Sequence, residues 1–150
     1  MLTFTQGDLL RSDAKALVNT VNTQGVMGKG IALSFKLTFP YNFQVYAGAC
    51  KNLSLTIGKI LVVTDQNMLL GERIIINFPT KTYWRMPSEY IYIILGLKAM
   101  RQYLISNSEV SVAMPAPGCG NGGLEWAKVK MMIIEHLEDL PNSIIVYEPF

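Results

Sequence analysis

Two units of strand, glycine-rich loop and helix constrain the fold of this chain more than any other feature of its sequence. In the first unit, the short apolar run at residues 17–21 predicts a buried strand. Gly25, Gly28 and Gly30 follow it before apolar residues resume at helical spacing. In the second unit, the apolar run at residues 110–114 leads into PAPGCGNGGLEW and then into a helix. Strands that alternate with helices in this way are typical of α/β folds.

The two glycine-rich loops predict a binding site for a diphosphate. Glycine can adopt positive φ and lets a ligand approach the bare backbone amides. A helix that begins near Gly30 directs unpaired N–H groups and the positive end of its dipole into the first loop, which favours phosphate. The spacing matches neither the dinucleotide fingerprint nor a Walker loop, because Lys29 is followed by Gly30. One such loop is often only a connection, but two at one sheet edge can hold a diphosphate together.

The composition indicates one well-packed domain over residues 1–150. The chain is 50% hydrophobic and 16% charged, which suits a buried sheet, and its length allows a core without disulfides. The net charge of +2 is too small to imply nucleic-acid binding. Any contact with DNA would therefore need a local cluster such as Lys81 with Arg85, or Lys128 with Lys130.

Metal sites and membrane spans are not expected. The cysteines, Cys50 and Cys119, and the only histidine, His136, show no metal-ligand spacing, so we expect no metal and no cofactor. No apolar run approaches the roughly 20 residues of a membrane span, and no secretion signal is recognisable. We therefore expect a cytoplasmic protein that does not engage a membrane.

The remaining segments predict a sheet with helices packed around it. We expect strands at residues 2–5, 59–64, 73–77 and 143–147, the middle two forming a hairpin. We expect helices at residues 30–39, 41–51 and about 124–139, and another that begins after a Ser88 cap. In the first helix we expect Ile31, Leu33, Phe35 and Leu37 to face the core.

Four motifs in register make the chain resemble the macrodomain family, which binds ADP-ribose. They are GDLL, VNTVNTQGVMGKGIAL, NFPTK and PGCGNGGLEW, which begin at Gly7, Val18, Asn77 and Pro117. The chain is most similar to the branch of the DNA ADP-ribosyl glycohydrolase antitoxins, which reverse ADP-ribosylation of thymidine in DNA. The resemblance covers essentially the whole chain. It implies a three-layer α/β/α sandwich with a mixed central sheet, with ADP-ribosylated DNA as substrate and a cognate ADP-ribosyltransferase toxin as partner.

The resemblance also implies roles for single residues. Asp8 would accept a hydrogen bond from the adenine amine, although an aspartate after glycine also suits a turn. Asn22, in preference to Asn19, would lie near the distal ribose, although both side chains could instead bond the loop backbone. The residues that we expect to contact ADP-ribose are Asp8, Leu9, Asn22, Gly25, Val26, Gly28, Lys29, Gly30, Ile31, Thr80, Pro117, Gly118, Cys119, Gly120, Asn121, Gly122 and Gly123.

Lys81 is the implied catalytic residue, because the lysine of the NFPTK motif is catalytic in this branch. Without the resemblance it would be an exposed loop lysine, since Pro79 should end the preceding strand. An unprotonated amine can attack the anomeric carbon of the distal ribose and expel the base. Cys119 could also be a nucleophile, but with no histidine near it in the sequence we favour packing.

One departure from related hydrolases leaves alternative functions open. Macrodomain hydrolases that pair the lysine with an aspartate carry it in a G-C-G-x-D pattern, and Gly122 stands at that position here. The missing acid favours a reader that binds ADP-ribose without chemistry, whereas the retained Lys81 argues against it. Hydrolysis of small derivatives, such as O-acetyl-ADP-ribose or ADP-ribose 1″-phosphate, is a further alternative that the fold alone does not separate.

Overall fold

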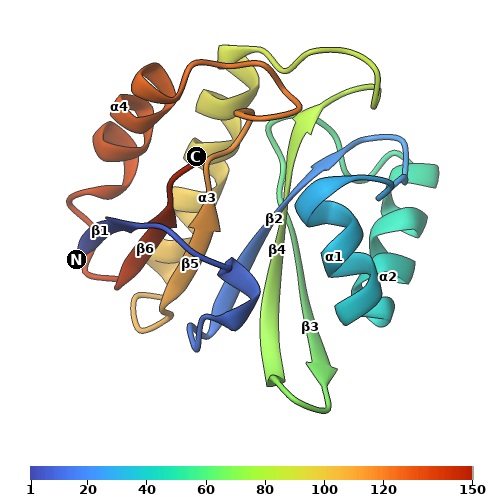
Figure 1. Cartoon of the computed structure of the whole chain (residues 1–150), viewed down its shortest axis with the longest axis horizontal. Helices are drawn as coiled ribbons and strands as arrows, with labels where there is room; N and C mark the ends of the chain where they lie inside the picture. The colour runs from blue at the N-terminus through green and yellow to red at the C-terminus, as the bar shows by residue number, and fades with distance from the viewer. Residues whose placement is uncertain (150) are drawn as a thin grey trace.

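The computed structural model describes residues 1–149 as one six-stranded mixed sheet with helices on both faces (Figure 1). In sheet order the strands are β1 (Leu2–Thr5), β6 (Ile144–Tyr147), β5 (Val112–Pro115), β2 (Ala16–Asn22), β4 (Gly71–Lys81) and β3 (Leu61–Asn67). The helices are η1 (Leu9–Arg11), α1 (Gly30–Thr38), α2 (Pro40–Lys51), α3 (Tyr90–Ser106) and α4 (Trp126–Leu137). The predicted three-layer α/β/α sandwich is confirmed.

The strand directions gather five carboxyl ends at one edge of the sheet. β1, β6, β5, β2 and β4 run parallel to one another, and only β3 runs antiparallel, as the first strand of the predicted hairpin with β4. The connections that follow β2, β4 and β5 therefore leave the sheet on the same side. This edge is where open α/β sheets bind ligands.

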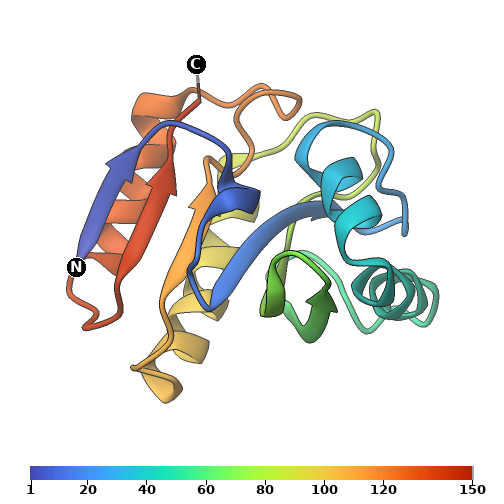
Figure 2. The same ribbon diagram turned by 60° about the horizontal axis from the view of Figure 1, so that its bottom comes forward.

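Alternating side chains of the central strand β2 build the cores on the two faces of the sheet. Ala16 and Val18 are buried against α3 and α4, whereas Leu17 is buried against α1 and Val21 against α2. Successive strand residues point to opposite faces, so a strand covered on both sides carries apolar residues at consecutive positions, as residues 16–18 do. Figure 2 shows α1 and α2 on one face of the sheet and α3 and α4 on the other.

The prediction that Pro79 ends its strand was wrong. β4 continues to Lys81, and its last residues pair only with β2, because β3 extends no further along β4 than Asn77. Proline lacks an amide hydrogen and is tolerated where a strand has a partner on one side only. Lys81 therefore lies at the end of a long strand and not in a loop.

Two predicted core positions of α1 were also wrong. Leu33 is 37% exposed and Leu37 is 75% exposed, whereas Phe35 is fully buried together with Phe39. Residues two apart in a helix point in different directions, and residues four apart share a face. The phenylalanines, and not the leucines, therefore face the sheet.

Ser88 does not cap α3 as predicted. The helix begins at Tyr90, its N-cap is Glu89, and no side chain makes a capping hydrogen bond there. The backbone N–H of Ser88 donates instead to the carbonyl oxygen of Gly122 at 3.0 Å, and its hydroxyl is buried beneath the second glycine-rich loop. Ser88 thus supports that loop and not the helix.

Candidate functional site

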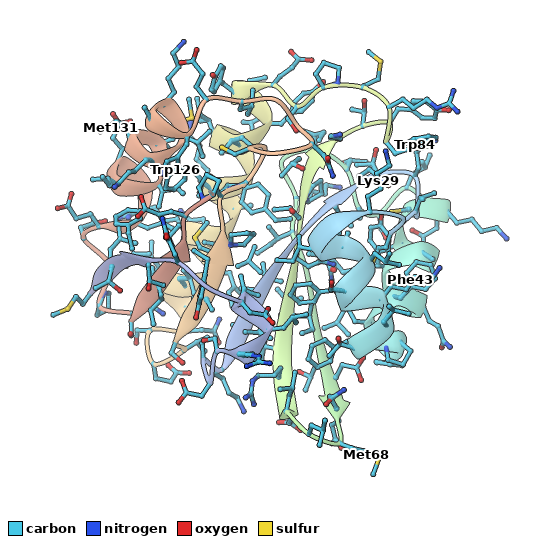
Figure 3. The ribbon with its side chains drawn as sticks, viewed as in Figure 1. Lys29, Phe43, Met68, Trp84, Trp126 and Met131 are labelled. Carbon is cyan, nitrogen blue, oxygen red and sulfur yellow. The ribbon has the colours of Figure 1, made fainter. Side chains whose placement is uncertain are left out.

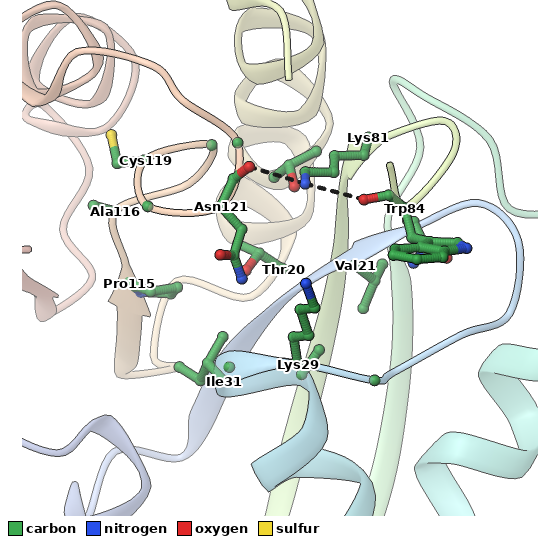
Figure 4. A pocket seen from close by; sticks show the side chains of 18 of the residues that line it. Thr20, Val21, Lys29, Ile31, Lys81, Trp84, Pro115, Ala116, Cys119 and Asn121 are labelled. Atoms are coloured by element: carbon green, nitrogen blue, oxygen red, sulfur yellow. Dashed lines mark hydrogen bonds between the residues drawn. The ribbon is translucent and has the colours of Figure 1, made fainter. Parts of the chain in front are cut away.

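A cavity of about 700 Å³ lies at the carboxyl ends of the parallel strands, between the two glycine-rich loops. Of the residues singled out from the sequence, those that line it are Asn22, Val26, Gly28, Lys29, Gly30, Ile31, Thr80, Lys81, Gly118, Cys119, Gly120, Asn121 and Gly122. Figure 4 shows Lys29 extending into the cavity from the first loop and Lys81 from the end of β4. Segments far apart in the sequence thus form one wall.

Five of the predicted contact residues do not line this cavity. They are Asp8, Leu9, Gly25, Pro117 and Gly123. The carboxylate of Asp8 accepts a hydrogen bond from the Leu10 N–H at 3.0 Å and caps η1, as the turn interpretation expects. Leu9 is buried in the core against α1.

Sequence reasoning did not include several residues of the cavity wall among the expected ADP-ribose contacts. Arg85 lines the wall beside Lys81, with which it was named only as a possible DNA contact, and Trp84 lines the wall as well. Tyr147, at the end of β6, lines it as well. Nothing in the residue pattern placed Tyr147 there, because it reaches the cavity only through the order of the strands.

Asn22 determines the shape of the first glycine-rich loop. Its Oδ1 accepts hydrogen bonds from the backbone N–H of Gln24 at 3.0 Å and of Val26 at 3.4 Å, and its Nδ2 donates to the Val26 oxygen at 2.8 Å. The Tyr46 hydroxyl also donates to this Oδ1 at 2.8 Å, and burial raises the pKa of Tyr46, which keeps that proton in place. Asn19 is fully buried and contacts Met27 instead.

The glycines at the ends of the two loops are required by the backbone. Gly30 begins α1 with φ of +57°, a value that favours glycine, so the first N–H groups of the helix face the cavity. Gly118 has φ of +78°, and a Cβ on it would lie 2.7 Å from Leu124 Cδ1. Both loops therefore present backbone where a side chain would otherwise stand.

The Lys81 ammonium joins two loops beside the cavity. Its Nζ donates to the backbone oxygen of Asn121 at 3.0 Å and to that of Trp84 at 3.3 Å (Figure 4). The loop after β4 is in turn tied to the first glycine-rich loop, because the Thr23 hydroxyl donates to the Thr82 oxygen at 2.8 Å. The amine is thus held in a defined place.

The cavity wall is positively charged. Lys29, Lys81 and Arg85 line it, and no aspartate or glutamate does. Within residues 1–149, none of the three forms an ion pair with a carboxylate. The small net charge of the whole chain therefore hides a local concentration of cations, which suits an anionic ligand.

The backbone excludes an acid at the position of Gly122. A Cβ built there would lie 2.3 Å from the Gly118 carbonyl oxygen and 2.4 Å from Ser88 Oγ. No side chain fits at such distances unless the loop moves. The second-loop aspartate of related hydrolases is thus not only missing from this sequence but also incompatible with this loop.

Cys119 lacks the properties of a nucleophile. Its Sγ donates a hydrogen bond to the Pro117 oxygen at 3.9 Å, the side chain packs against the core, and burial raises the pKa of its thiol to about 11. A nucleophilic cysteine needs a lowered pKa and a base near it. The geometry favours the packing interpretation.

The described part of the chain, residues 1–149, contains no cluster of three histidine, cysteine, aspartate or glutamate side chains that could hold a metal ion. None of the helices in the same residues is long and apolar enough to cross a membrane.

Comparison with known proteins connects this geometry to one family. The family model described as Macro domain matches residues 18–133. The chain is 48% identical over 150 residues to the DNA ADP-ribosyl glycohydrolase of Mycobacterium tuberculosis, an alignment that covers 99% of this chain and 42% of that protein. It is similar to the solved macrodomain of Mycobacterium tuberculosis DarG, with a TM-score of 0.94 and 46% identity over 100% of this chain and 99% of the other.

A second relative comes from Thermosipho africanus. The chain is 34% identical over 162 positions to its DNA ADP-ribosyl transferase-DNA ADP-ribosyl glycohydrolase fusion protein, covering 99% of this chain and 42% of the fusion. The structure of Thermosipho africanus DarTG in complex with ADP-ribose matches with a TM-score of 0.92 and 35% identity, covering 99% of this chain and 42% of the other. The chain thus spans about two fifths of the length of both curated relatives.

Proposed function

The chain belongs to the Macro domain family, and we propose that it is a DNA ADP-ribosyl glycohydrolase that removes ADP-ribose from modified thymine bases. The relative from Mycobacterium tuberculosis carries this activity in its name, and the chain spans 42% of its length, so the activity is proposed here for one domain over residues 1–150. The observation that carries the proposal is the Lys81 ammonium, fixed at the end of β4 between the two glycine-rich loops.

The size and charge of the cavity support ADP-ribose as the bound part of the substrate. The amides of the two glycine-rich loops would hold the diphosphate, and Lys29 would supply a positive charge that no carboxylate offsets within residues 1–149. Asn22 would hold the loop in shape beside the distal ribose, and Asp8 would accept a hydrogen bond from adenine outside the cavity wall. The Thermosipho africanus relative was solved with ADP-ribose bound.

In the proposed reaction, Lys81 Nζ forms a bond to the anomeric carbon of the distal ribose while the bond from that carbon to the thymine nitrogen breaks. The Lys81 ammonium first gives one proton to water, because only the neutral amine has a lone pair. The amine loses a second proton as the new bond forms, and the departing base takes up a proton. Water then cleaves the bond between lysine and ribose, which releases ADP-ribose and restores the amine. No side chain among residues 1–149 brings a carboxylate to the cavity wall, so the proton passes between the amine, the base and water.

The test is hydrolysis of an oligonucleotide that carries ADP-ribosylated thymidine, followed by chromatography of the released ADP-ribose. We expect turnover by the wild-type protein and a loss of roughly 10²- to 10⁴-fold with Lys81→Ala, the range for removal of a group that transfers protons or attacks. ADP-ribose affinity should stay within a few-fold. Lys59→Ala, an exposed lysine away from the cavity, is the matched control. Unchanged turnover with Lys81→Ala would remove Lys81 from the mechanism.

The same assay separates the proposal from a reader that binds ADP-ribose without chemistry. The exclusion of an acid at Gly122 is the observation that favours a reader. Calorimetric binding of ADP-ribose by the wild-type protein, with no release from modified DNA or from small ADP-ribose derivatives, would favour that function. Turnover of the small derivatives alone would identify a hydrolase of those compounds.

We also propose that this domain acts against a cognate DNA ADP-ribosyltransferase in the cytoplasm. The Thermosipho africanus relative joins the two activities in the name of one fusion protein, which supports a functional pairing. Expression of such a transferase with and without this chain, followed by measurement of ADP-ribose on DNA, tests the pairing.

A further inference from the structure

Exposed aromatic and cationic side chains form a rim beside the cavity. The rim consists of Tyr83, Trp84 and Arg85, which are separated from the end of β4 by Thr82 alone. Tyr83 is 41% exposed and Trp84 is 37% exposed. The only other tryptophan, Trp126, instead packs edge to face on Phe4. Large aromatic rings in solvent beside a binding cavity need an explanation, because burial would be favourable for them.

Cations surround the Trp84 ring. The Arg85 guanidinium carbon lies 4.5 Å from the centroid of the indole, and Lys29 Nζ approaches the same ring from the first glycine-rich loop at 5.9 Å. Figure 3 shows Lys29 and Trp84 close together on this side of the molecule. Neither cation pairs with a carboxylate in the part of the chain that the structure describes. The rim therefore offers an aromatic face together with unneutralised positive charge.

The backbone of the rim is held in place before any ligand arrives. The Trp84 N–H donates to Gln24 Oε1 at 2.9 Å, and the Met86 N–H donates to the Tyr83 oxygen at 2.9 Å. A fixed ring loses less conformational entropy on binding than a mobile one. The rim is thus a preformed surface.

The rim also lies where the carrier, that is, the molecule to which the ADP-ribosyl group is attached, must leave the cavity. Lys81 Nζ donates to the Trp84 backbone oxygen at 3.3 Å, so the proposed nucleophile and the indole belong to one short turn. A group attached to the anomeric carbon near Lys81 therefore passes beside Trp84. The chemistry of the rim should match that group.

We propose that the rim binds the single-stranded nucleic acid that carries the ADP-ribosyl group, with Trp84 stacked on a base and Arg85 paired with a phosphate. Aromatic rings beside Arg or Lys are the usual means of holding single strands, since every base has a face that can stack. In a duplex these faces are covered by neighbouring bases. The inference rests on the proposed function for the identity of the carrier, and it adds which side chains beside the cavity hold that carrier.

The first experiment measures binding alone and does not depend on catalysis. The anisotropy of a labelled, unmodified single-stranded oligonucleotide of seven thymidines is followed with wild-type protein and with Trp84→Ala. We expect about tenfold weaker binding with Trp84→Ala, as is usual for the loss of one stacked base. Tyr41→Ala, which removes an exposed ring on α2, should bind like the wild type. Equal affinities for Trp84→Ala and wild type would overturn the proposal.

Charge and strandedness give two further outcomes of the same titration. Arg85→Gln should lower the slope of log affinity against log salt by about 0.7, the value for one phosphate contact on a single strand. Lys59→Gln, an exposed lysine elsewhere, should leave the slope unchanged. A duplex of the same thymidine strand should bind at least tenfold more weakly than the single strand. Equal binding of duplex and single strand would contradict the proposal.

Turnover then separates this inference from the proposed function. The ratio of kcat/KM for an ADP-ribosylated oligonucleotide to kcat/KM for ADP-ribosylated thymidine nucleoside should fall about tenfold with Trp84→Ala. If the wild type releases ADP-ribose and Trp84→Ala lowers both values by the same factor, the rim proposal is wrong and the proposed function stands. If the single strand binds through Trp84 but no ADP-ribose is released, the proposed function is wrong and the rim proposal stands.

Discussion

The ammonium of Lys81 donates a hydrogen bond across the edge of the cavity to the backbone oxygen of Asn121, 3.0 Å away in the second glycine-rich loop. The same side chain would be the nucleophile in the proposed reaction. Lys29 lies in the same cavity, but its ammonium makes no hydrogen bond to residues 1–149. The two lysines therefore differ in what they do for the structure, although both bring a positive charge.

Removal of the Lys81 amine should loosen the second glycine-rich loop. A hydrogen bond of this kind contributes roughly 1 kcal/mol, so Lys81→Ala should raise amide hydrogen exchange in residues 118–123 by about threefold to tenfold. Lys29→Ala removes the same charge without breaking a bond to this loop and should leave its exchange unchanged. Exchange that rises equally in both variants would show that charge, and not the hydrogen bond, orders the loop.

Restoring the acid of related hydrolases at position 122 should damage the protein. Gly122→Asp places a Cβ within 2.4 Å of Ser88 Oγ and even closer to the Gly118 oxygen, so the loop must shift. Overpacking of this kind costs about 1–3 kcal/mol, which lowers Tm by several degrees in a domain of this size. Thermal unfolding and turnover are both measured. Asn121→Asp is the control, because it adds a carboxylate at the neighbouring position of the same loop. A stable and more active Gly122→Asp would contradict this account.

The layers of the fold could be predicted because each unit of strand, loop and helix is continuous in the sequence. The run at residues 17–21, the turn to Gly30 and the apolar residues after it suffice to define one such unit. The extent of β4 could not be predicted in the same way. Whether Pro79 ends a strand depends on how far the neighbouring β3 reaches, and that is a fact of tertiary structure.

The residues of the cavity wall also divide into those that the sequence could predict and those that it could not. The motifs supplied most of its residues because glycine-rich loops and their flanking strands are recognisable in the sequence. Tyr147 was missed because it reaches the cavity through the pairing of β6 with β5, which no residue pattern encodes. The absence of an acid at Gly122 is visible in the sequence, but its steric cause is not, because it comes from the Gly118 carbonyl oxygen in the folded loop and from Ser88 Oγ in a distant segment.

Asn22→Ala should destabilise the first glycine-rich loop and weaken ADP-ribose binding together. The substitution leaves the N–H groups of Gln24 and Val26 without their acceptor, at a cost of roughly 1–3 kcal/mol, whereas the buried Tyr46 hydroxyl keeps the backbone oxygen of residue 22 as an acceptor at 2.8 Å. Urea unfolding and ADP-ribose titration measure the two effects. Asn22→Asp keeps the acceptor oxygen and should lose less stability. If Asn22→Ala instead keeps full stability and loses only binding, the side chain contacts the ribose directly.

Asp8 should distinguish adenine from hypoxanthine. An ionised carboxylate accepts a hydrogen bond from the adenine amine but faces only an oxygen at that position in hypoxanthine. We expect the wild-type protein to bind ADP-ribose about tenfold more tightly than the inosine analogue, and Asp8→Ala to remove this preference. Competition titrations with the two ligands measure it. A preference that persists in Asp8→Ala would leave Asp8 with only its observed role, the cap of η1.

The Cys119 thiol should react slowly with alkylating reagents, although the residue lines the cavity wall. Burial raises its pKa from 9.0 to about 11, so the thiolate that reacts with alkylating reagents is scarce in the folded protein at neutral pH. At pH 8 the two pKa values imply about 100-fold less thiolate in the folded chain than in the unfolded chain. The rate of iodoacetamide labelling, followed at this cysteine by mass spectrometry, should rise about tenfold per pH unit up to pH 10. Saturating ADP-ribose should slow it further, because Cys119 lines the proposed site. Fast labelling that is already constant between pH 6 and pH 8 would instead indicate a lowered pKa and return Cys119 to the list of possible nucleophiles.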